Sequence, residues 1–391
     1  MSLSVPIRST VVDVDLDALV QNYETLRKRA NGANVISVVK ADAYGHGVEA
    51  VAEALAEAGT AMLGVFTVEE ALALRAVGIH VPILVFVGVT DRAEAEAVVA
   101  ADCSVVVWDM TAAKLLDNAA ASANRTAHVH FKVDTGLTRL GSPVDEAAKR
   151  YRAIRDLEHV SVEGLMTHLA TADEADVSQD RTQLARFAEV LSAIGEPPRF
   201  VHATASGGIA AFRAVPGCNT IRPGVALHGL PASPHQAGMV DLRPTLTWRS
   251  RVRRVSAAKK GTGVSYGHEY HLPNDGRIAT VPVGYGDGLP RSLGKRGRVL
   301  VGGRAIPFAG RIAMDLIMLD VTELPDTKEG DDVVLIGEQR EARQTADDLA
   351  AAAGTINYEI VTGIRRRVPR RYHRGGRIVA TRTLAGGYAR Q

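Results

Sequence analysis

A lysine stands at the end of an apolar segment near the start of the chain, VISVVK at residues 35–40. Four of the five residues before Lys40 are Val or Ile, a composition typical of a strand that is buried on both faces. A buried ammonium group is costly unless it is paired, and burial favours the neutral amine that a Schiff base requires. The alternative is a strand-end lysine whose ammonium group reaches solvent. The segment therefore makes Lys40 a candidate nucleophile.

The elements that must position this lysine follow a regular order. From residue 35 to about residue 225, short apolar strands alternate with amphipathic helices. The predicted strands cover residues 35–40, 61–66, 82–88, 103–108, 127–133, 160–168, 199–204 and 219–222. Eight such repeats favour an α/β fold with a closed (β/α)8 TIM-type barrel over an open sheet.

The barrel predicts where chemistry should take place, because active sites in this fold form at the carboxyl ends of the strands. Lys40, His168 and Arg222 each end a predicted strand. Arg139 and Ser206 lie in the loops just beyond two others. We therefore expect these five side chains at one end of the barrel.

After about residue 240 the pattern changes to strands without helices between them, which predicts a mostly β domain. The predicted domains are residues 1–240 and 241–391, and a first strand at about residues 9–15 could join the second domain. One helix is predicted at residues 345–354, with Thr345 as its cap. Residues 232–242, which have little periodicity, are the predicted linker.

Composition narrows the kinds of partner. The chain has 391 residues, 46% of them hydrophobic, and a formal net charge of +2, which does not favour nucleic acid or an anionic membrane. Its two cysteines, Cys103 and Cys218, are far apart and suggest neither a disulfide framework nor a zinc ribbon. No segment has the length and hydrophobicity of a membrane span or an export signal. We expect a soluble cytoplasmic protein that acts on a small molecule.

Four segments are specific enough to indicate a family: VVKADAYGHG, DTGLTRLG, IRPG and TINYEI. Together they closely resemble the alanine racemases, in the same order along the chain. The resemblance implies a pyridoxal phosphate (PLP) cofactor and a homodimer with shared active sites. It also implies interconversion of L-alanine and D-alanine, which supplies D-alanine for peptidoglycan.

The resemblance assigns two catalytic bases. Lys40 would bind PLP covalently and act as one base, and Tyr266 in GVSYGHEY would be the opposite base, contributed by the partner subunit. His168 and Arg222 would support them, with Arg222 facing the pyridine nitrogen of the cofactor. Taken alone, the local sequences favour a turn tyrosine at Tyr266 and a strand-end arginine in a surface ion pair at Arg222.

Further positions are assigned to the cofactor and substrate by the same resemblance. The phosphate would be bound by Tyr44, Ser206, the backbone amides of Gly224 and Val225, and Tyr358. Arg139 would contact the phenolic oxygen of PLP and the substrate carboxylate, and Lys132 matches a lysine that is often carbamylated in this family. The loop with Met314 and Asp315 would line the partner's site, and Tyr285 would stand at the substrate entrance.

The sequence also departs from the family pattern. Ala205 stands where Asn is frequent, His228 where Tyr is frequent, Ala313 where Cys is frequent and Leu316 where Gln is frequent. These changes affect expected hydrogen bonds around the site more than the reaction type. The effect on the catalytic rate, the carbamylation of Lys132, and a biosynthetic as opposed to a catabolic role do not follow from the sequence.

Two other functions fit parts of the pattern. One is a broad-specificity amino-acid racemase, against which the bulk of Tyr358 argues. The other is a PLP-binding barrel protein that serves cofactor homeostasis without turnover, against which the β domain with Tyr266 argues.

Two weaker signals favour structure over function. His128 and His130 share one face of a predicted strand, but no third ligand is near, so no metal site is expected. The basic segment at residues 364–377 could contact nucleic acid, but we interpret it as a solvent-exposed surface.

Overall fold

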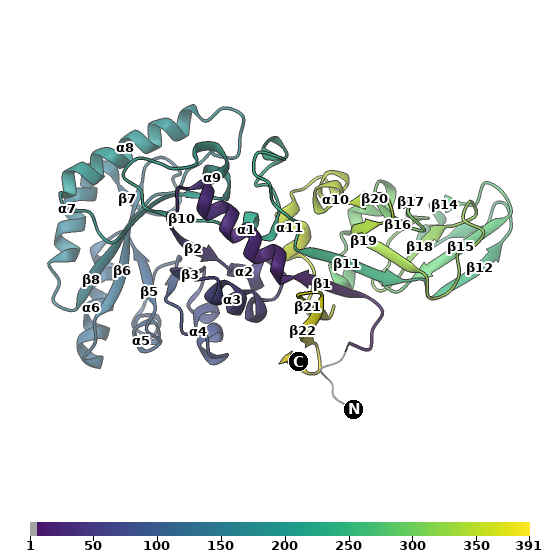
Figure 1. The fold of residues 1–391 in the computed structure, drawn as a ribbon, viewed down its shortest axis with the longest axis horizontal. Helices are drawn as coiled ribbons and strands as arrows, with labels where there is room; N and C mark the ends of the chain where they lie inside the picture. Colours follow the sequence, from purple (N-terminus) through teal and green to yellow (C-terminus); the bar gives the residue numbers. More distant parts are fainter. Residues whose placement is uncertain (1–5) are drawn as a thin grey trace. The chain divides into compact units, whose positions relative to one another are not determined.

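Eight parallel strands close into a barrel in the computed structural model, which describes residues 6–391. The strands pair in the order β5-β4-β3-β2-β10-β9-β8-β6, and β5 also pairs with β6, which closes the ring. They are β2 (Asn34–Val38), β3 (Met62–Val65), β4 (Ile83–Val85), β5 (Ser104–Val107), β6 (Ala127–Asp134), β8 (Val160–Met166), β9 (Phe200–Ala205) and β10 (Thr220–Arg222). The predicted barrel is confirmed, with each expected strand present (Figure 1).

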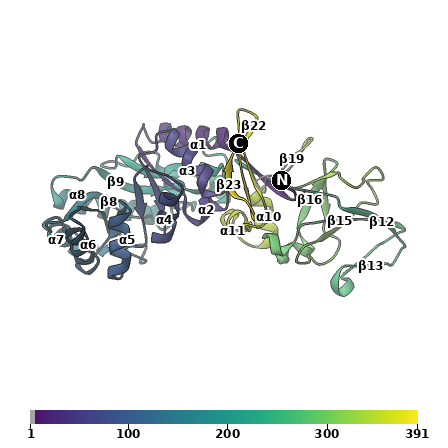
Figure 2. The same ribbon diagram turned by 90° about the horizontal axis from the view of Figure 1, so that it is seen from below.

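Helices surround these strands, as Figures 1 and 2 show. They are α4 (Val68–Ala76), α5 (Arg92–Ala100), α6 (Met110–Ala123), α7 (Val144–Arg155), α8 (Ser178–Ile194) and α9 (Ser206–Phe212), with a short β7 (Ser142–Pro143) before α7. Side chains that accept hydrogen bonds from the first turn fix three helix starts: Thr67 at α4, Asp91 at α5 and Asp109 at α6. The helices expected between the strands are therefore present, and α9 is an additional helix where a loop was predicted.

The interior of the barrel is filled by apolar side chains from several strands. One layer consists of Ile36, Met62, Leu84, Val106, Met166 and Phe200, each 3% exposed or less. Full burial of such a side chain contributes about 1.5–3 kcal/mol, so this layer is a main source of the barrel's stability. The barrel is a packed core, and its chemistry must lie at one end.

The second unit is mostly β. It contains residues 6–17, 44–50 and 245–391, and the barrel unit contains residues 18–43 and 51–244. Its main sheet has the order β17-β16-β19-β11-β1-β21-β22-β23, with β20 beside β19, and smaller sheets join β12-β15-β18 and β13-β14. The strand β1 lies within the segment expected at residues 9–15, and it pairs with β11 and β21 of this unit.

The elements of this unit have the following bounds. The strands are β1 (Val11–Asp15), β11 (Leu246–Arg251), β12 (Arg254–Ala258), β13 (Gly263–Val264), β14 (Tyr270–His271), β15 (Gly276–Val281), β16 (Arg298–Val301), β17 (Arg304–Pro307), β18 (Ile317–Asp320), β19 (Asp332–Gln339), β20 (Ala342–Gln344), β21 (Arg370–Arg374), β22 (Arg377–Thr383) and β23 (Gly387–Arg390). The helices are α10 (Ala346–Ala353) and α11 (Asn357–Thr362). Thr345 caps α10, as predicted. Two further helices, α1 (Leu16–Arg29) and α3 (Val48–Glu57), contain residues of both units.

Three predicted positions shift at the barrel end. Strand β2 ends at Val38 and β8 ends at Met166, so Lys40 and His168 each lie two residues beyond a strand. Ser206 is the first residue of α9 and is not in a loop. Single hydrogen bonds to the neighbouring strands continue beyond these ends, from Val39 to Gly64 and from Thr167 to His202.

The interpretation of residues 364–377 as a solvent-exposed surface is only partly correct: Arg365, Arg366, Arg374 and Arg377 are exposed, but other residues of the segment are buried. Strand β21 lies within this segment, and alternation along a strand buries every second side chain. Arg370 and Tyr372 are fully buried, and Arg370 donates hydrogen bonds to the carbonyls of Gly45, Ile364 and Val368. Arginines of this segment therefore hold the β unit together.

Two smaller expectations also change. His128 is exposed while His130 is fully buried, and the pairing of β6 with β8 skips Glu163 between Val129 and His130. Residues 232–242 belong to the barrel unit and are mostly exposed, and buried Gln236 attaches them to it by donating to the carbonyls of Ala172 and Gly207. Among residues 6–391, no group of His, Cys, Asp or Glu is arranged to hold a metal ion.

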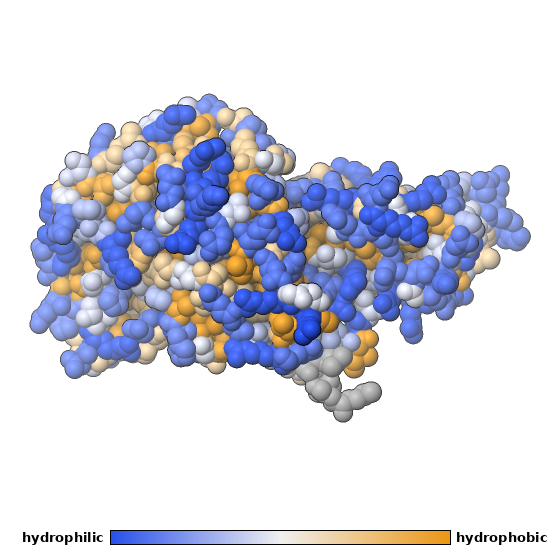
Figure 3. Space-filling model, in the orientation of Figure 1, coloured by the Kyte–Doolittle hydropathy of each residue, from blue (hydrophilic) through white to orange (hydrophobic). Residues whose placement is uncertain are grey.

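The distribution of hydrophobic residues is relevant to contacts with other molecules and with membranes. On the face shown in Figure 3, hydrophilic and hydrophobic residues are interspersed over both units. Within residues 6–391, no helix is long and apolar enough to cross a membrane. Both cysteines are free thiols.

A partly buried charge cluster joins three strands of the main sheet. Asp13 of β1 accepts hydrogen bonds from Arg371 and His373 of β21 and pairs with Arg249 of β11, at 2.7–2.8 Å. Burial alone would raise the pKa of Asp13, but the bonds from His373 and Arg371 outweigh it and lower the pKa to about 2. The folded state therefore stabilises the Asp13 carboxylate.

This cluster predicts a pH-dependent stability. A carboxyl pKa lowered from 3.8 to about 2 contributes about 2 kcal/mol, present above the unfolded-state pKa and lost as the pH falls through the folded-state pKa. Chemical unfolding of wild type and Asp13→Asn should therefore differ by about this amount near neutral pH. The difference should shrink below about pH 4. A difference that is equal at neutral and acidic pH would contradict the assignment.

Candidate active site

Lys40 begins a short turn with unusual backbone angles. The turn is α2 (Lys40–Tyr44), in which Ala41, Asp42, Ala43 and Tyr44 all have positive φ values of 51–57°. A left-handed conformation costs about 1–2 kcal/mol for each residue that is not glycine. Contacts with neighbouring elements must therefore hold this turn, and with it Lys40.

Glu70 of α4 supplies one of these contacts. Its carboxylate accepts hydrogen bonds from the backbone amides of Ala41 at 2.6 Å and Phe66 at 2.8 Å. Glu70 also completes the capping box of α4 with Thr67. The ammonium nitrogen of Lys40 lies 6.0 Å from the ring centroid of Phe66. One carboxylate thus ties the lysine turn to the start of a helix.

The electrostatic surroundings of Lys40 favour the neutral amine. Burial lowers its pKa below the usual lysine value, and the positive charge of Arg139 lowers it further, while Glu70 opposes the shift. Lys132, on β6, is more strongly affected: burial first, then the charges of Arg222 and Arg139, lower its pKa to about 8. The barrel end therefore contains two lysines with a tendency to lose their protons.

Arg222 lies at the end of β10 and is 2% exposed. Its guanidinium donates hydrogen bonds to His202 Nδ1 at 2.8 Å, His168 Nδ1 at 3.1 Å and the carbonyl of Thr167 at 2.8 Å. A further bond reaches the carbonyl of Ala203 at 3.2 Å. Burial lowers the pKa of Arg222 to about 10, so it remains a cation at neutral pH.

The two histidines beside Arg222 are neutral. Burial and the charge of Arg222 lower the pKa of His168 well below its usual value, with smaller effects from Arg139, Lys132 and Lys40. The structure thus brings together His168 and the four predicted site residues whose charges act on it, Arg222, Arg139, Lys132 and Lys40. The surface-ion-pair alternative for Arg222 is excluded by its burial.

Ser206, Gly224 and Val225 form a second group at this end. The Ser206 hydroxyl oxygen accepts hydrogen bonds from the backbone amides of Gly224 at 3.0 Å and Ala226 at 3.2 Å. The hydroxyl proton of Ser206 can therefore point toward an anion. Val225 begins the 3₁₀ turn η1 (Val225–His228) directly after Gly224.

The remaining predicted residues lie in the β unit. The rings of Tyr44 and Tyr358 meet edge to face, with centroids 6.1 Å apart, so the two predicted phosphate ligands of this unit are neighbours. Tyr266 lies in the 3₁₀ turn η3 (Tyr266–His268) and is 72% exposed.

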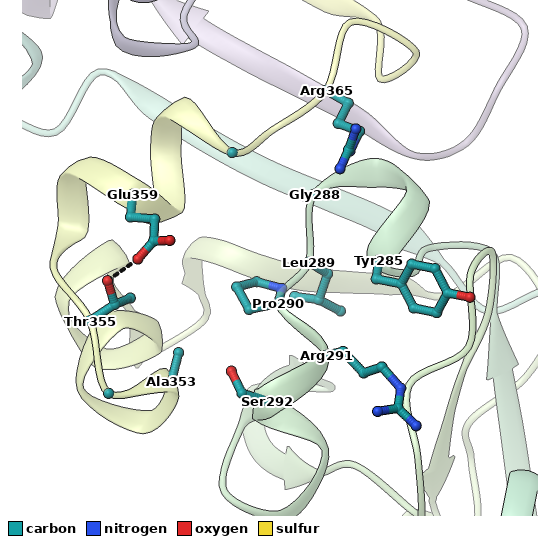
Figure 4. Close-up of a pocket in the computed structure, with 12 residues that line it drawn as sticks. Tyr285, Gly288, Leu289, Pro290, Arg291, Ser292, Ala353, Thr355, Glu359 and Arg365 are labelled. Atoms are coloured by element: carbon teal, nitrogen blue, oxygen red, sulfur yellow. Dashed lines mark hydrogen bonds between the residues drawn. The ribbon is translucent and has the colours of Figure 1, made fainter.

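Tyr285, Met314 and Asp315 are also brought together. The amides of Tyr285 and Gly286 donate to the carbonyls of Ala313 and Met314, and Asp315 pairs with Arg367 at 2.6 Å. Tyr285 lines a pocket of about 550 Å³. Figure 4 shows Tyr285 on one side of this pocket and the hydrogen-bonded pair Thr355 and Glu359 on the other.

Sequence reasoning missed several residues of the barrel end. His202 binds Arg222 directly, and Glu70 holds the lysine turn. His202 lies near the end of the strand predicted at residues 199–204. A polar residue at an inward-facing position of such a strand could have marked it as a site residue. Nothing in the sequence marked Glu70, because its contact with Ala41 joins segments that are far apart in the chain.

Comparison with known proteins agrees with this geometry. The profile "Alanine racemase, N-terminal domain" matches residues 14–232, and "Alanine racemase, C-terminal domain" matches residues 245–372. An alanine racemase of Halothermothrix orenii is 44% identical over 370 residues, which cover 93% of this chain and 97% of the relative.

Solved structures agree as well. The alanine racemase from the D-cycloserine producer Streptomyces lavendulae has a TM-score of 0.88 at 38% identity, covering 95% of this chain and 98% of that chain. The enzyme from Bartonella henselae, solved with covalently bound pyridoxal phosphate, has a TM-score of 0.84 at 29% identity, covering 93% and 99%.

The barrel, the β unit and these matches define the class, an isomerase that acts on amino acids. Within that class, the chain belongs to the alanine racemase family.

The contacts of Glu70 predict a local effect on the lysine turn. Glu70→Ala should speed amide hydrogen exchange at Ala41 and Phe66, and should lower the free energy of unfolding by about 1 kcal/mol through the lost cap. The exposed neighbour Glu69, in the same helical turn, provides the control as Glu69→Ala. Equal exchange in the two variants would show that Glu70 does not hold the turn.

Proposed function

We propose that this protein interconverts L-alanine and D-alanine with pyridoxal phosphate, using Lys40 of one subunit and Tyr266 of its partner as the two bases. The observation that carries the proposal is the position of the Lys40 amine and the Arg222 guanidinium in one cluster at the carboxyl end of the barrel. The physiological role proposed is supply of D-alanine for peptidoglycan in the cytoplasm.

The residues present fit the cofactor. Members of this family depend on pyridoxal phosphate. Lys40 has an amine of lowered pKa for covalent attachment, and Arg222 is a cation that can face the ring nitrogen. The Ser206 hydroxyl proton and the amide of Val225 are hydrogen-bond donors suited to a phosphate, while the amide of Gly224 donates to Ser206 and orients its hydroxyl.

The β unit adds donors of the same kind. The phenols of Tyr44 and Tyr358 are proposed to donate to the phosphate. Bound pyridoxal phosphate acts as an electron sink that makes the α-proton of an amino acid removable.

The two bases must work on opposite faces of the substrate. Lys40, once its amine is free, accepts or returns the α-proton on one face, and its lowered pKa brings it closer to the operating pH. Tyr266 serves the other face. A free tyrosine has a pKa of about 10, so donors or cations of the partner's barrel end, such as Arg222 through His168, must stabilise the phenolate.

Substrate choice depends on the surrounding side chains. Arg139 is exposed at the barrel end, where its guanidinium can bind the α-carboxylate. Tyr358 restricts the side-chain space to little more than a methyl group. Tyr285, Met314 and Asp315 are proposed to form the entrance.

A mixed dimer tests the shared site. Lys40→Ala and Tyr266→Ala homodimers should each lack efficient racemisation, because every site has lost one base. In a mixed dimer one site loses both bases and the other keeps both. Random reassortment makes half of the dimers mixed, so activity should recover to roughly a quarter of wild type.

The assay unfolds or dissociates the two inactive variants together, refolds them and measures racemisation of each alanine enantiomer. Each variant treated alone is the control, and mass-tagged chains confirm subunit exchange. Recovery near zero with confirmed exchange would mean that both residues serve one site from one chain, or that Tyr266 is not the second base.

A further inference from the structure

Behind Arg222, a row of polar side chains continues into the barrel interior. His202 Nδ1 accepts from Arg222 at 2.8 Å, and His202 Nε2 lies 2.8 Å from His130 Nδ1. On its other side, His130 Nε2 lies 3.3 Å from Glu163 Oε1, which also accepts a hydrogen bond from Ser104. Both histidines are fully buried.

The arginine fixes the direction of every bond in this row. A guanidinium can only donate, so His202 Nδ1 must be an acceptor and a neutral His202 must carry its proton on Nε2. That proton points to His130 Nδ1, which is then also an acceptor. His130 must therefore carry its proton on Nε2, the nitrogen that lies 3.3 Å from Glu163 Oε1 as an ion-pair contact without the alignment of a hydrogen bond.

The surrounding protein maintains the neutral histidines that this pattern needs. Burial lowers the pKa of His130, although Glu163 opposes the shift, and burial followed by the charge of Arg222 lowers the pKa of His202 strongly. Burial would raise the pKa of Glu163, but the bonds to His130 and Ser104 outweigh it, so the carboxylate stays charged.

The sequence makes room for this row at one position. A Cβ on Gly164 would lie 2.2 Å from His130 Nδ1, so only glycine allows the ring to stand there. Phe200 stacks on the other side of His130, with centroids 5.7 Å apart and planes at 17°. His130 is therefore held in one orientation.

We propose that His130 and Glu163 are positioning residues: from the far end of the row they stabilise the His202 tautomer that Arg222 requires, and thereby hold the Arg222 guanidinium in place. This role depends on the part proposed for Arg222 at the cofactor ring. Without the carboxylate, the His130 proton loses the negative charge beside it. Moving that proton to Nδ1 would place an N–H of His130 opposite the Nε2–H of His202. His202 could relieve this repulsion only by moving its own proton to Nδ1, where it would face a donor of Arg222.

The test combines ring-nitrogen NMR of ¹⁵N-histidine-labelled holoenzyme with steady-state kinetics. In wild type, His130 and His202 should both be protonated on Nε2. Glu163→Leu should give a mixture of tautomers and lower kcat about 10-fold, with a smaller effect on KM. Glu163→Gln, which keeps an acceptor oxygen, should restore the tautomer and most of kcat, and exposed Glu189→Leu is the matched control.

The wild-type spectrum alone can overturn the proposal, even if Glu163→Leu does not fold: a proton on His202 Nδ1 would do so. Glu163→Leu with unchanged tautomers would also overturn it. A changed tautomer with unchanged kcat would refute positioning of Arg222 while leaving racemisation intact. Absence of racemisation in wild type would instead contradict the proposed function.

Discussion

The barrel end depends on one buried cation. Arg222 is 2% exposed, and the four acceptors that it contacts are two neutral histidines and two backbone carbonyls. Taking a charge out of water is costly unless hydrogen bonds replace its hydration, and these four bonds do so without a carboxylate in contact. The positive charge is therefore not neutralised locally, and it acts on titratable groups nearby.

The consequences reach the groups that would perform chemistry. With burial, this cation and Arg139 lower the pKa of Lys132 and His168, and Arg139 does so for Lys40. The amines of Lys40 and Lys132 therefore both have lowered pKa values, and they differ in the backbone that carries them. Lys40 belongs to a left-handed turn held by Glu70, while Lys132 lies within a regular strand, so the two amines are positioned by different elements.

Much of this arrangement follows from local patterns. Apolar strands alternating with helices predicted the barrel, and the carboxyl ends of its strands predicted where Lys40, His168 and Arg222 gather. The row from His202 to Glu163 was not predicted, because its contacts join side chains of three strands that are far apart in the sequence. The burial of Arg370 was missed for a related reason: charge composition alone does not show which face of a strand is covered.

The central claim is that Lys40, and not the more deeply buried Lys132, binds the cofactor. Borohydride reduction of the holoenzyme, followed by proteolysis and mass spectrometry, would lock the covalent link and locate it. If Lys40 binds the cofactor, the pyridoxyl mass will lie on the peptide containing Lys40, with Lys132 unmodified by it. A pyridoxyl group on Lys132, or on any other lysine, would contradict this assignment.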